Sequence, residues 1–312
     1  MLDLSVLQRS WAPPELPQEI PHGDMPGDKV SIGSGHIQKA NTIFPRLMQL
    51  LYTALSSGSE PRAVVSVCGG SGVGKSEIAS LLTYYLNQLG VGAYTLSGDN
   101  YPHRIPLQND AERIRVFRVS GMRSLLASGG YSEERARILH ECVCAGSDAD
   151  PNITATHSWM AAYQKAGRAG LKGYLGTQNE IDFAELSEIL ARFHSGADDL
   201  WLKRMGREET ALWYERVDAR SLCVLVVEWT HGNNDLLHHV DIPILLNSTP
   251  KETLEHRRLR ARDGAPDSPF TTMVLELEQE LLISQAHKAK LIVSKSGELL
   301  TFEQYMRLLT EQ

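Results

Sequence analysis

The feature that most constrains the fold is a glycine-rich stretch between a predicted strand and a predicted helix, within residues 64–89. The run from Val64 to Cys68 is apolar and rich in β-branched residues, which is typical of a buried strand. It leads into GGSGVGKS (69–76), which fits G-x-x-x-x-G-K-S at every fixed position. Residues 77–89 then show the apolar periodicity of a helix. Strand, glycine loop and helix in this order are the context of a phosphate-binding loop.

The residues of this loop have the chemistry that a nucleoside triphosphate requires. Glycines let consecutive backbone N–H groups turn inward around a phosphate, and the helix N-terminus favours the same negative charge. Lys75 is expected to reach the β- and γ-phosphates, and Ser76 to bind Mg²⁺. An ordinary glycine-rich turn is the alternative, and the flanking strand and helix disfavour it. We therefore predict binding of ATP and Mg²⁺ through Gly69, Gly70, Ser71, Gly72, Val73, Gly74, Lys75, Ser76 and Glu77.

Composition limits the possible partners. The net charge of −7 argues against nucleic acid or an anionic membrane surface as a bulk partner. No apolar run approaches the roughly 18 residues of a membrane span, and the N-terminus has no signal-peptide pattern. Four cysteines in a chain of 312 residues are typical of a reducing compartment, so we expect a cytoplasmic protein. Cys142-x-Cys144 lacks a second Cys/His pair at zinc spacing and is interpreted as a helix face.

The N-terminal part differs in composition from the rest of the chain. Residues 1–33 contain five prolines among polar residues, which predicts an extended arm and leaves open whether it packs on the body. A helix is expected over 36–55, and a break at 56–61 precedes the first strand. We therefore divide the chain into an arm and helix at 1–60 and an α/β domain at 61–312.

The remaining pattern predicts a mostly parallel sheet flanked by helices, because strand signals alternate with helix signals. Further strands are expected at 93–96, 222–228, 241–246 and 290–293. Between the second and third strands, helical patterns and a β-ribbon (200–206 and 210–216) suggest an insertion at 103–216 on the acceptor side. Helices are predicted at 109–126, 132–144, 156–171, 182–193, 272–288 and 301–309, with a further start at the capping box Thr249–Glu252.

Charged residues near the strand ends suggest how the phosphate would be used. Asp99 follows the second strand, and ligands of open α/β sheets lie beyond the carboxyl ends of strands. Glu228 is the carboxylate at the end of the third strand. The segment 256–264 carries four arginines and a histidine, which predicts a lid at 255–270 that clamps the phosphates. A solvated basic face, or ion pairs with the Glu-rich helix at 276–280, is the alternative. Guanine-reading motifs are absent, so a GTPase is disfavoured.

A second basic cluster follows Asp99: His103, Arg104, Arg113, Arg115, Arg118 and Arg123. In an acidic chain it suggests an anionic acceptor, such as a sugar phosphate or a carboxylate. Arginines on solvated helix faces explain the same pattern equally well. His231, His238 and His239 are interpreted as ordinary surface or hydrogen-bonded histidines. Hydrophobic anchoring is expected of Trp159, Trp201 and Trp213.

The chain resembles the P-loop kinases of the uridine kinase, phosphoribulokinase and pantothenate kinase family. The resemblance covers residues 61–295 and rests on the order of five features. They are the phosphate loop, Asp99-Asn-Tyr101, Asn179-Glu-Ile-Asp-Phe183, Val227-Glu-Trp-Thr-His-Gly232 and Arg258-x-x-x-Arg262-Asp263. The family usually has Glu-Gly where this chain has Glu228-Trp229, the stretch 103–178 is long, and residues 1–60 have no counterpart.

The resemblance implies a kinase that transfers the γ-phosphoryl of ATP to a hydroxyl of a nucleoside, sugar phosphate or small hydroxy acid. It implies Asp99 as the general base, Lys75, Arg258 and Arg262 as further catalytic residues, and Ser76 with Glu228 at the magnesium. Acceptor contacts are expected from Tyr101, His103, Arg104 and Asp182. Alternatives are an adenylylsulfate kinase-type enzyme on the same core and a nucleotide-gated regulatory ATPase. The sequence leaves open whether the chain forms a homo-oligomer.

Overall fold

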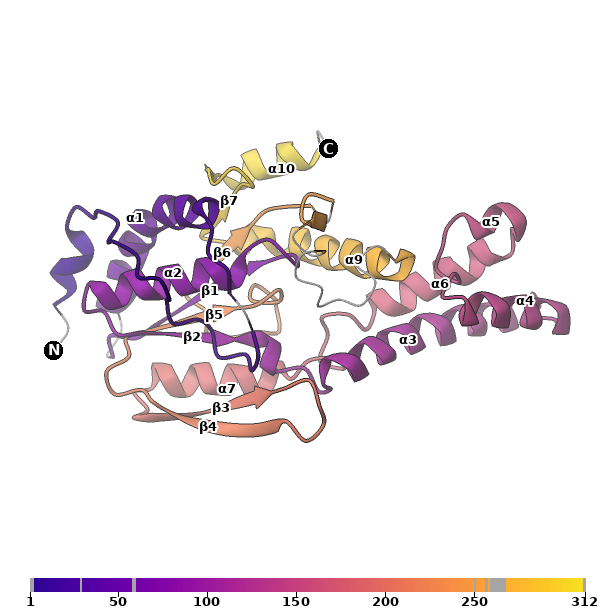
Figure 1. Cartoon of the computed structure of the whole chain (residues 1–312), viewed down its shortest axis with the longest axis horizontal. Coiled ribbons are helices and arrows are strands. Elements are labelled where there is room, and N and C mark those ends of the chain that lie inside the picture. Colours follow the sequence, from indigo (N-terminus) through magenta and orange to yellow (C-terminus); the bar gives the residue numbers. More distant parts are fainter. Residues whose placement is uncertain are drawn as a thin grey trace.

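The fold is built on a six-stranded sheet whose order along the sheet is β2-β5-β1-β6-β7-β8 (Figure 1). The computed structural model describes residues 3–28, 30–57, 60–249, 251–255, 258 and 268–310. The first five strands are parallel, and β8 pairs antiparallel with β7. The predicted mostly parallel sheet is therefore confirmed, with β8 as the strand that sequence patterning missed. The strands are β1 (Ala63–Gly69), β2 (Ala93–Ser97), β5 (Val224–Glu228), β6 (Ile242–Leu246), β7 (Leu291–Val293) and β8 (Leu299–Leu300).

Helices cover both faces of the sheet because alternate side chains of its strands point to opposite faces. On one face, Val65 and Val67 of β1 belong to the core formed with α1 (Ser34–Ser57) and α2 (Lys75–Gln88). On the other face, Val64 packs in the cluster that contains α7 (Phe183–His194). Residues of α9 (Pro269–Gln285), followed by η3 (Ala286–Lys288), pack over Leu245 of β6 on that same face.

The predicted helical insertion forms an arm beside the sheet (Figure 1). It contains α3 (Pro106–Ala127), α4 (Glu133–Cys144), α5 (Ile153–Thr156) and α6 (Met160–Lys172). The predicted cap Ser132 accepts the N–H of Arg135 at 3.3 Å. Two helix starts were predicted wrongly. The helix α3 begins before Asn109, because Pro106 suits the first turn. The helix expected at 156–171 begins only at Met160, and the separate short helix α5 precedes it.

The predicted β-ribbon is formed by β3 (Asp199–Met205) and β4 (Leu212–Asp218), which pair antiparallel. The expectation of three tryptophan anchors holds only for Trp159, which packs on the core of the arm. Trp201 and Trp213 remain 54% and 45% exposed, because this two-stranded ribbon leaves both side chains partly open to solvent.

The N-terminal segment packs on the body along α2 (Figure 1). After η1 (Leu4–Gln8), the Trp11 ring lies against Phe44 and Tyr85, with centroid distances of 4.7 and 5.1 Å. The hydroxyl of Tyr84 donates to the carbonyl of Glu15 at 3.2 Å. The sequence left open whether the N-terminal segment packs on the body. These contacts show that its described residues pack against α1 and α2.

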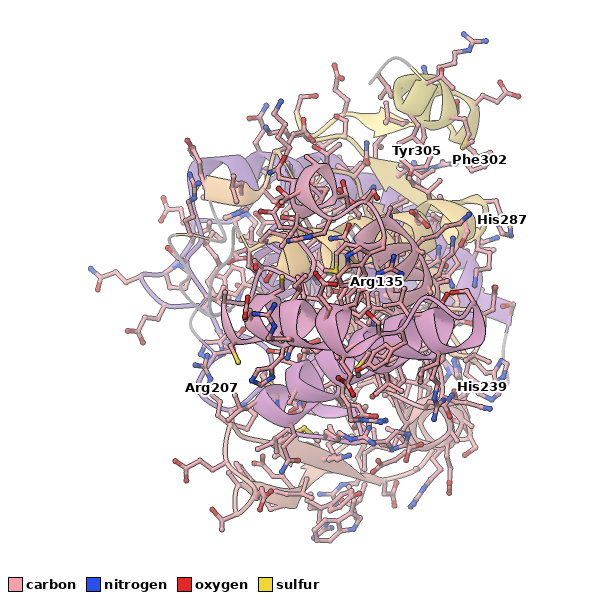
Figure 2. All side chains as sticks on the ribbon, turned by 90° about the vertical axis from the view of Figure 1, so that its right-hand side faces the viewer. Arg135, Arg207, His239, His287, Phe302 and Tyr305 are labelled. Atoms are coloured by element: carbon pink, nitrogen blue, oxygen red, sulfur yellow. The ribbon has the colours of Figure 1, made fainter. Side chains whose placement is uncertain are left out.

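The C-terminal helix α10 (Phe302–Thr310) packs on the sheet through Tyr305, which is buried, whereas Phe302 lies at the surface (Figure 2). Within the part of the chain that the structure describes, every helix is too short or too polar to cross a membrane.

Candidate active site

The glycine loop joins β1 to α2 in the conformation that its sequence predicts. Gly69 ends β1 with φ of +152°, and a Cβ there would lie 2.6 Å from the carbonyl oxygen of Leu246. Gly74 is the N-cap of α2 with φ of +97°, and a Cβ there would lie 3.0 Å from the His36 ring. Both positions therefore require glycine. The N-cap offers no side chain to the first amides of α2, which leaves this end suited to a phosphate.

A serine and a glutamate meet beside this loop. The Ser76 hydroxyl donates to Oε2 of Glu228 at 3.1 Å, and the Ser97 hydroxyl donates to Oε1 at 2.5 Å. Burial and the neighbouring Asp99 charge raise the pKa of Glu228 to about 7, although Ser97, Lys75 and Ser76 oppose the shift. A bound cation would favour the ionised carboxylate, and hydroxyl and carboxylate oxygens suit Mg²⁺. This pair therefore fits the predicted magnesium ligands.

The ends of three strands bring Asp99 to the same edge. Val67 of β1 and Ser97 of β2 both lie opposite Glu228 of β5 in the sheet. The short helix η2 (Gly98–Asn100) follows at once and carries Asp99 with its side chain exposed. Lys75 completes the group at the start of α2, where Nζ donates to the Gly70 carbonyl at 3.1 Å.

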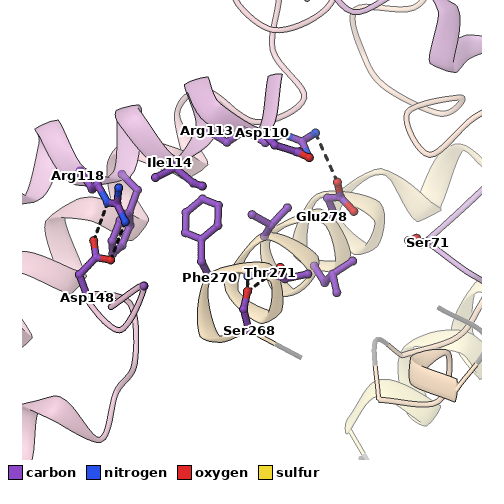
Figure 3. A pocket seen from close by; sticks show the side chains of 14 residues that line it. Ser71, Asp110, Arg113, Ile114, Arg118, Asp148, Ser268, Phe270, Thr271 and Glu278 are labelled. Atoms are coloured by element: carbon purple, nitrogen blue, oxygen red, sulfur yellow. Dashed lines mark hydrogen bonds and ion pairs between the residues drawn. The ribbon is translucent and has the colours of Figure 1, made fainter. Parts of the chain in front are cut away.

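Asp99 lines a cavity of about 570 Å³ that also reaches Ser71 of the glycine loop. Its lining also includes the start of α3, Glu180 and Glu278 of α9. Trp229, Thr230 and His231, directly after β5, line a further part. A second cavity of about 390 Å³ lies between α3 and α9 and shares Ser71, Asp110, Arg113 and Glu278 with the first (Figure 3).

Glu180 accepts hydrogen bonds from other polar groups at the first cavity. Glu180 is fully buried and accepts from Nε of Arg113 at 2.5 Å, from Asn109 at 3.0 Å and from the amide of Gly176 at 2.6 Å. Burial, the largest single influence, raises the pKa of Glu180, but the Arg113 charge, His231 and the Gly176 amide together outweigh it, so this pKa lies below its ordinary value. The expectation that His231 is an ordinary surface or hydrogen-bonded histidine is wrong about its place: it is buried, and burial lowers its pKa to about 4.

The predicted acceptor residues separate into two groups. Arg104 lines the cavity and donates to the Tyr174 hydroxyl at 3.0 Å. Tyr101 is fully buried in the hydrophobic cluster under α7. Asp182 caps α7 by accepting the amide of Glu185 at 2.9 Å, and His103 contacts the Gln178 carbonyl at 2.9 Å. None of these last three lines the cavity, so we leave them out of the proposed acceptor site.

The basic cluster on α3 is largely neutralised by carboxylates. Arg118 forms two hydrogen bonds of 3.0 Å with Asp148 (Figure 3). Arg115 pairs with Glu112 at 2.6 Å. Together with the Arg113–Glu180 pair, these contacts disfavour an anionic acceptor at this cluster. The alternative of solvated helix faces fits the exposed Arg115, whereas Arg113 and Arg118 lie in part-buried ion pairs. Arg123 lies exposed on α3.

The structure describes only part of the segment 255–270, for which a lid was predicted. Thr249 and Glu252 form both hydrogen bonds of the predicted capping box, at 2.8 and 3.3 Å. Arg258 is exposed and helical, and Arg262 lies outside the described residues. The alternative of ion pairs between the basic segment and the Glu-rich helix at 276–280 loses support, because Glu276 and Glu280 already pair with Arg168 of α6, both at 2.7 Å.

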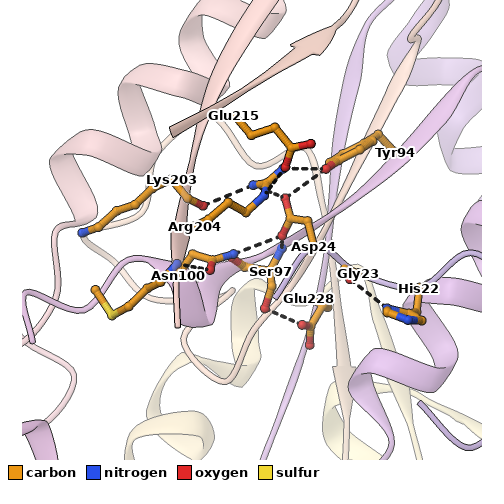
Figure 4. Close-up of polar contacts among 11 residues, drawn as sticks. His22, Gly23, Asp24, Tyr94, Ser97, Asn100, Lys203, Arg204, Glu215 and Glu228 are labelled. Atoms are coloured by element: carbon orange, nitrogen blue, oxygen red, sulfur yellow. Dashed lines mark hydrogen bonds and ion pairs between the residues drawn. The ribbon is translucent and has the colours of Figure 1, made fainter. Parts of the chain in front are cut away.

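Sequence patterning missed the N-terminal contribution to this site. Asp24 contacts the start of η2, and residues 25–28 line the cavity (Figure 4). The signal was weak: Asp24 precedes a Met-Pro-Gly turn in a proline-rich segment, and nothing local relates it to Asp99. Within the described ranges, no group of three or more His, Cys, Asp or Glu could hold a metal ion. Cys142 and Cys144 lie in the last turn of α4, the first buried and the second exposed.

Comparison with known proteins gives a sequence relative and several similar structures. No family model matches the chain. Over 252 residues, or 81% of the chain, it is 40% identical to the bifunctional alpha-galactosidase/sucrose kinase AgaSK of Mediterraneibacter gnavus. This match covers 22% of that protein, so the chain spans about a fifth of the relative's length.

Two solved structures cover most of the chain at low similarity. D-glycerate 3-kinase from Cryptococcus neoformans var. grubii covers 86% of this chain and 99% of its own, with a TM-score of 0.45 and 14% identity. A candidate fructose transport system kinase from Silicibacter sp. TM1040 covers 80% and 96%, with a TM-score of 0.43 and 12% identity. The function proposed below does not depend on these two likenesses.

Proposed function

We propose that the chain is an ATP- and Mg²⁺-dependent kinase that phosphorylates a hydroxyl of a small carbohydrate. One observation carries the proposal: the Ser76–Glu228 pair, Lys75 and Asp99 adjoin the phosphate-binding loop, and Asp99 also lines a cavity. Phosphoryl transfer depends on positioning and on electrostatic stabilisation, and these side chains supply both. Residues 61–312 would carry the nucleotide site and most of the acceptor site, with 103–216 on the acceptor side and 255–270 as the lid, and residues 25–28 would add to the wall of the cavity.

The roles of the residues follow from their positions. Backbone amides of the loop and Lys75 would bind the phosphates, and Arg258 and Arg262 would stabilise charge on the transferring group. Ser76 and Glu228 would hold Mg²⁺, which neutralises phosphate charge when bound.

Asp99 would accept the proton of the acceptor hydroxyl while the oxygen of that hydroxyl forms its bond to the γ-phosphorus. The bond between that phosphorus and the bridging oxygen of ADP breaks in the same transfer. The other hydroxyl groups of a carbohydrate find hydrogen-bonding groups in the walls of the cavity.

The charges of the cavity favour a neutral acceptor. Its described lining includes five carboxylates and three arginines, and one of these arginines is already paired with Glu180. A sugar phosphate would therefore meet more negative than positive charge. A neutral sugar can donate hydroxyl hydrogens to these carboxylates without bringing a negative charge of its own.

The named relative points to the same class of acceptor. Its name joins a galactosidase with a sucrose kinase, and a phosphate-binding loop belongs to phosphoryl transfer and not to glycoside hydrolysis. We therefore place sucrose first among the acceptors. Nucleosides, small hydroxy acids and adenylylsulfate remain the other acceptors to be tested.

The experiment is a phosphorylation assay with a defined panel. Purified protein, ATP and Mg²⁺ are incubated with sucrose, glucose, uridine, glycerate or adenylylsulfate, and mass spectrometry detects the gain of one phosphate. We expect phosphorylated sucrose, and we expect Lys75→Ala to lower its rate by at least about 100-fold, because the fixed positive charge at the phosphates is lost. Hydrolysis of ATP at one rate whatever the acceptor would contradict the proposal and favour a regulatory ATPase.

A further inference from the structure

The N-terminal segment places one carboxylate against the turn that carries Asp99. Asp24 accepts the backbone N–H of Ser97 on Oδ1 at 2.7 Å and the side-chain amide of Asn100 on the same oxygen at 3.1 Å (Figure 4). These two residues lie on either side of Asp99 along the chain. The side chain of Asp24 is 7% exposed, so these bonds lie in a nearly dry environment where they are strong.

The second oxygen of Asp24 is held as firmly as the first. Oδ2 accepts from Nη1 of Arg204 at 2.8 Å and from the Tyr94 hydroxyl at 3.2 Å (Figure 4). Arg204 also donates to Tyr94 at 3.0 Å and to Glu215 at 2.9 Å. The carboxylate therefore has four donors from β2, η2 and β3, which fix its orientation.

The turn itself is held between this segment and the ribbon. Asn100 donates to Asp24 and accepts the backbone N–H of Met205 at 2.9 Å. Ser97, whose amide binds Asp24, donates its hydroxyl to Glu228. One carboxylate thus connects the N-terminal segment to both ends of the turn and, through Ser97, to the proposed magnesium ligand.

The backbone of the N-terminal segment packs closely against the end of β2 at Gly23. A Cβ at Gly23 would lie 3.4 Å from Thr95 and 3.6 Å from Oε1 of Glu228, so the backbone passes directly over the end of β2. Met25, Pro26, Gly27 and Asp28 continue along the wall of the cavity.

We infer that Asp24 is a positioning residue for phosphoryl transfer, through which the N-terminal segment completes the acceptor side of the active site. The inference rests on the proposed function, because it takes Asp99 as the group that Asp24 positions. Asp24 does not touch the reacting atoms. It holds Ser97 and Asn100, and thereby the backbone from which Asp99 reaches the acceptor.

The test compares Asp24→Ala and Asp24→Asn with Tyr84→Phe. Asp24→Ala should lower kcat for transfer to sucrose by roughly 10- to 100-fold, since small displacements of a catalytic group cost that much. ATP binding should change by less than about threefold. Asp24→Asn keeps an oxygen for Ser97 and Asn100 but loses the charge facing Arg204, so kcat should fall only roughly threefold to tenfold. Tyr84→Phe removes an anchor of the same segment far from the turn and should keep the wild-type kcat.

Amide hydrogen exchange gives a readout that does not depend on activity. The Ser97 amide should exchange faster in Asp24→Ala than in the wild type, and Tyr84→Phe should leave it unchanged. A folded Asp24→Ala with wild-type kcat, or with wild-type Ser97 exchange, would overturn the inference. If the alanine variant does not fold, wild-type kcat in Asp24→Asn overturns it and a severalfold loss supports it. Absence of transfer to any acceptor by the wild type would contradict the proposed function, and the exchange measurement would still test Asp24.

Discussion

The side chain of Trp229 packs directly against the backbone of Gly98, in the turn that carries Asp99. A Cβ at Gly98 would lie 2.1 Å from Cγ of Trp229, so the indole occupies the space that any larger residue at 98 would need. The ring is 2% exposed and lies 5.3 Å from both Phe183 and His231, measured between ring centroids. The chain therefore accommodates a tryptophan after Glu228, where the family it resembles has glycine, by using glycine at 98.

The stability of the fold should depend on pH through His194, which lies at the end of α7. Its Nε2 lies 3.2 Å from Oδ2 of Asp241 and 3.2 Å from the His239 carbonyl, and the hydrogen bond to Asp241 raises the pKa of His194 above 6.5. A histidine whose pKa is raised by folding stabilises the fold fully below the unfolded pKa, and this stabilisation is lost as pH rises through the folded pKa.

We therefore expect His194→Gln to destabilise the protein in a pH-dependent way. The free energy of unfolding should fall by about 1 kcal/mol below pH 6, where the charged hydrogen bond is present, and by less at pH 9. Urea unfolding of both proteins between pH 5.5 and 9 measures this difference. A difference that is constant or grows with pH would show that the charge of His194 contributes nothing.

At the scale of elements, the helical arm depends on close contact between α3 and α6. A Cβ at Gly167 would lie 2.6 Å from the Phe117 ring, and one at Gly121 would lie 2.5 Å from the Tyr163 ring. Each helix thus uses a glycine to receive an aromatic ring of the other. Since α3 carries Asn109 and Arg113 at the cavity, this packing also fixes one wall of the site.

Gly167→Ala should loosen this contact. Although alanine favours a helix by up to about 1 kcal/mol over glycine, the clash with Phe117 should reduce the free energy of unfolding by roughly 1 to 3 kcal/mol. Gly173→Ala, at the end of the same helix, is the matched control: its Cβ would meet carbonyl oxygens at 3.5 and 3.7 Å, an ordinary contact. Chemical denaturation measures both variants, and equal stability of the two would contradict the packing argument.

At the scale of the whole molecule, local patterns predicted what local interactions determine. The strand, glycine loop and helix around Lys75 were predicted because their sequence needs no distant partner to be recognised. The strand order was not predicted, because it depends on contacts between segments far apart in the chain. The parallel sheet class was predicted from the alternation of strands and helices.

The residues of the candidate site likewise divide into those that local sequence patterns could locate and those that they could not. Asp99 and Glu228 could be placed near the loop because Asp99 follows one predicted strand and Glu228 ends another, and parallel strands end at one edge of a sheet. The contact of Asp24 with Ser97 joins residues 73 positions apart and has no periodic signal. Tyr101 and Asp182 lie near the motifs in sequence, but folding turns one into the core and uses the other as a helix cap.

The measurement that tests the central claim most directly is the rate of phosphoryl transfer by Asp99→Asn. Asparagine preserves the size of the side chain but cannot accept a proton at neutral pH. We predict wild-type folding, ATP binding within a few-fold of the wild type, and transfer to the acceptor lowered by roughly 10²- to 10⁴-fold. Asp235→Asn, which alters an exposed carboxylate paired with Lys288, should transfer at the wild-type rate. A folded Asp99→Asn that keeps most of its transfer rate would contradict the account.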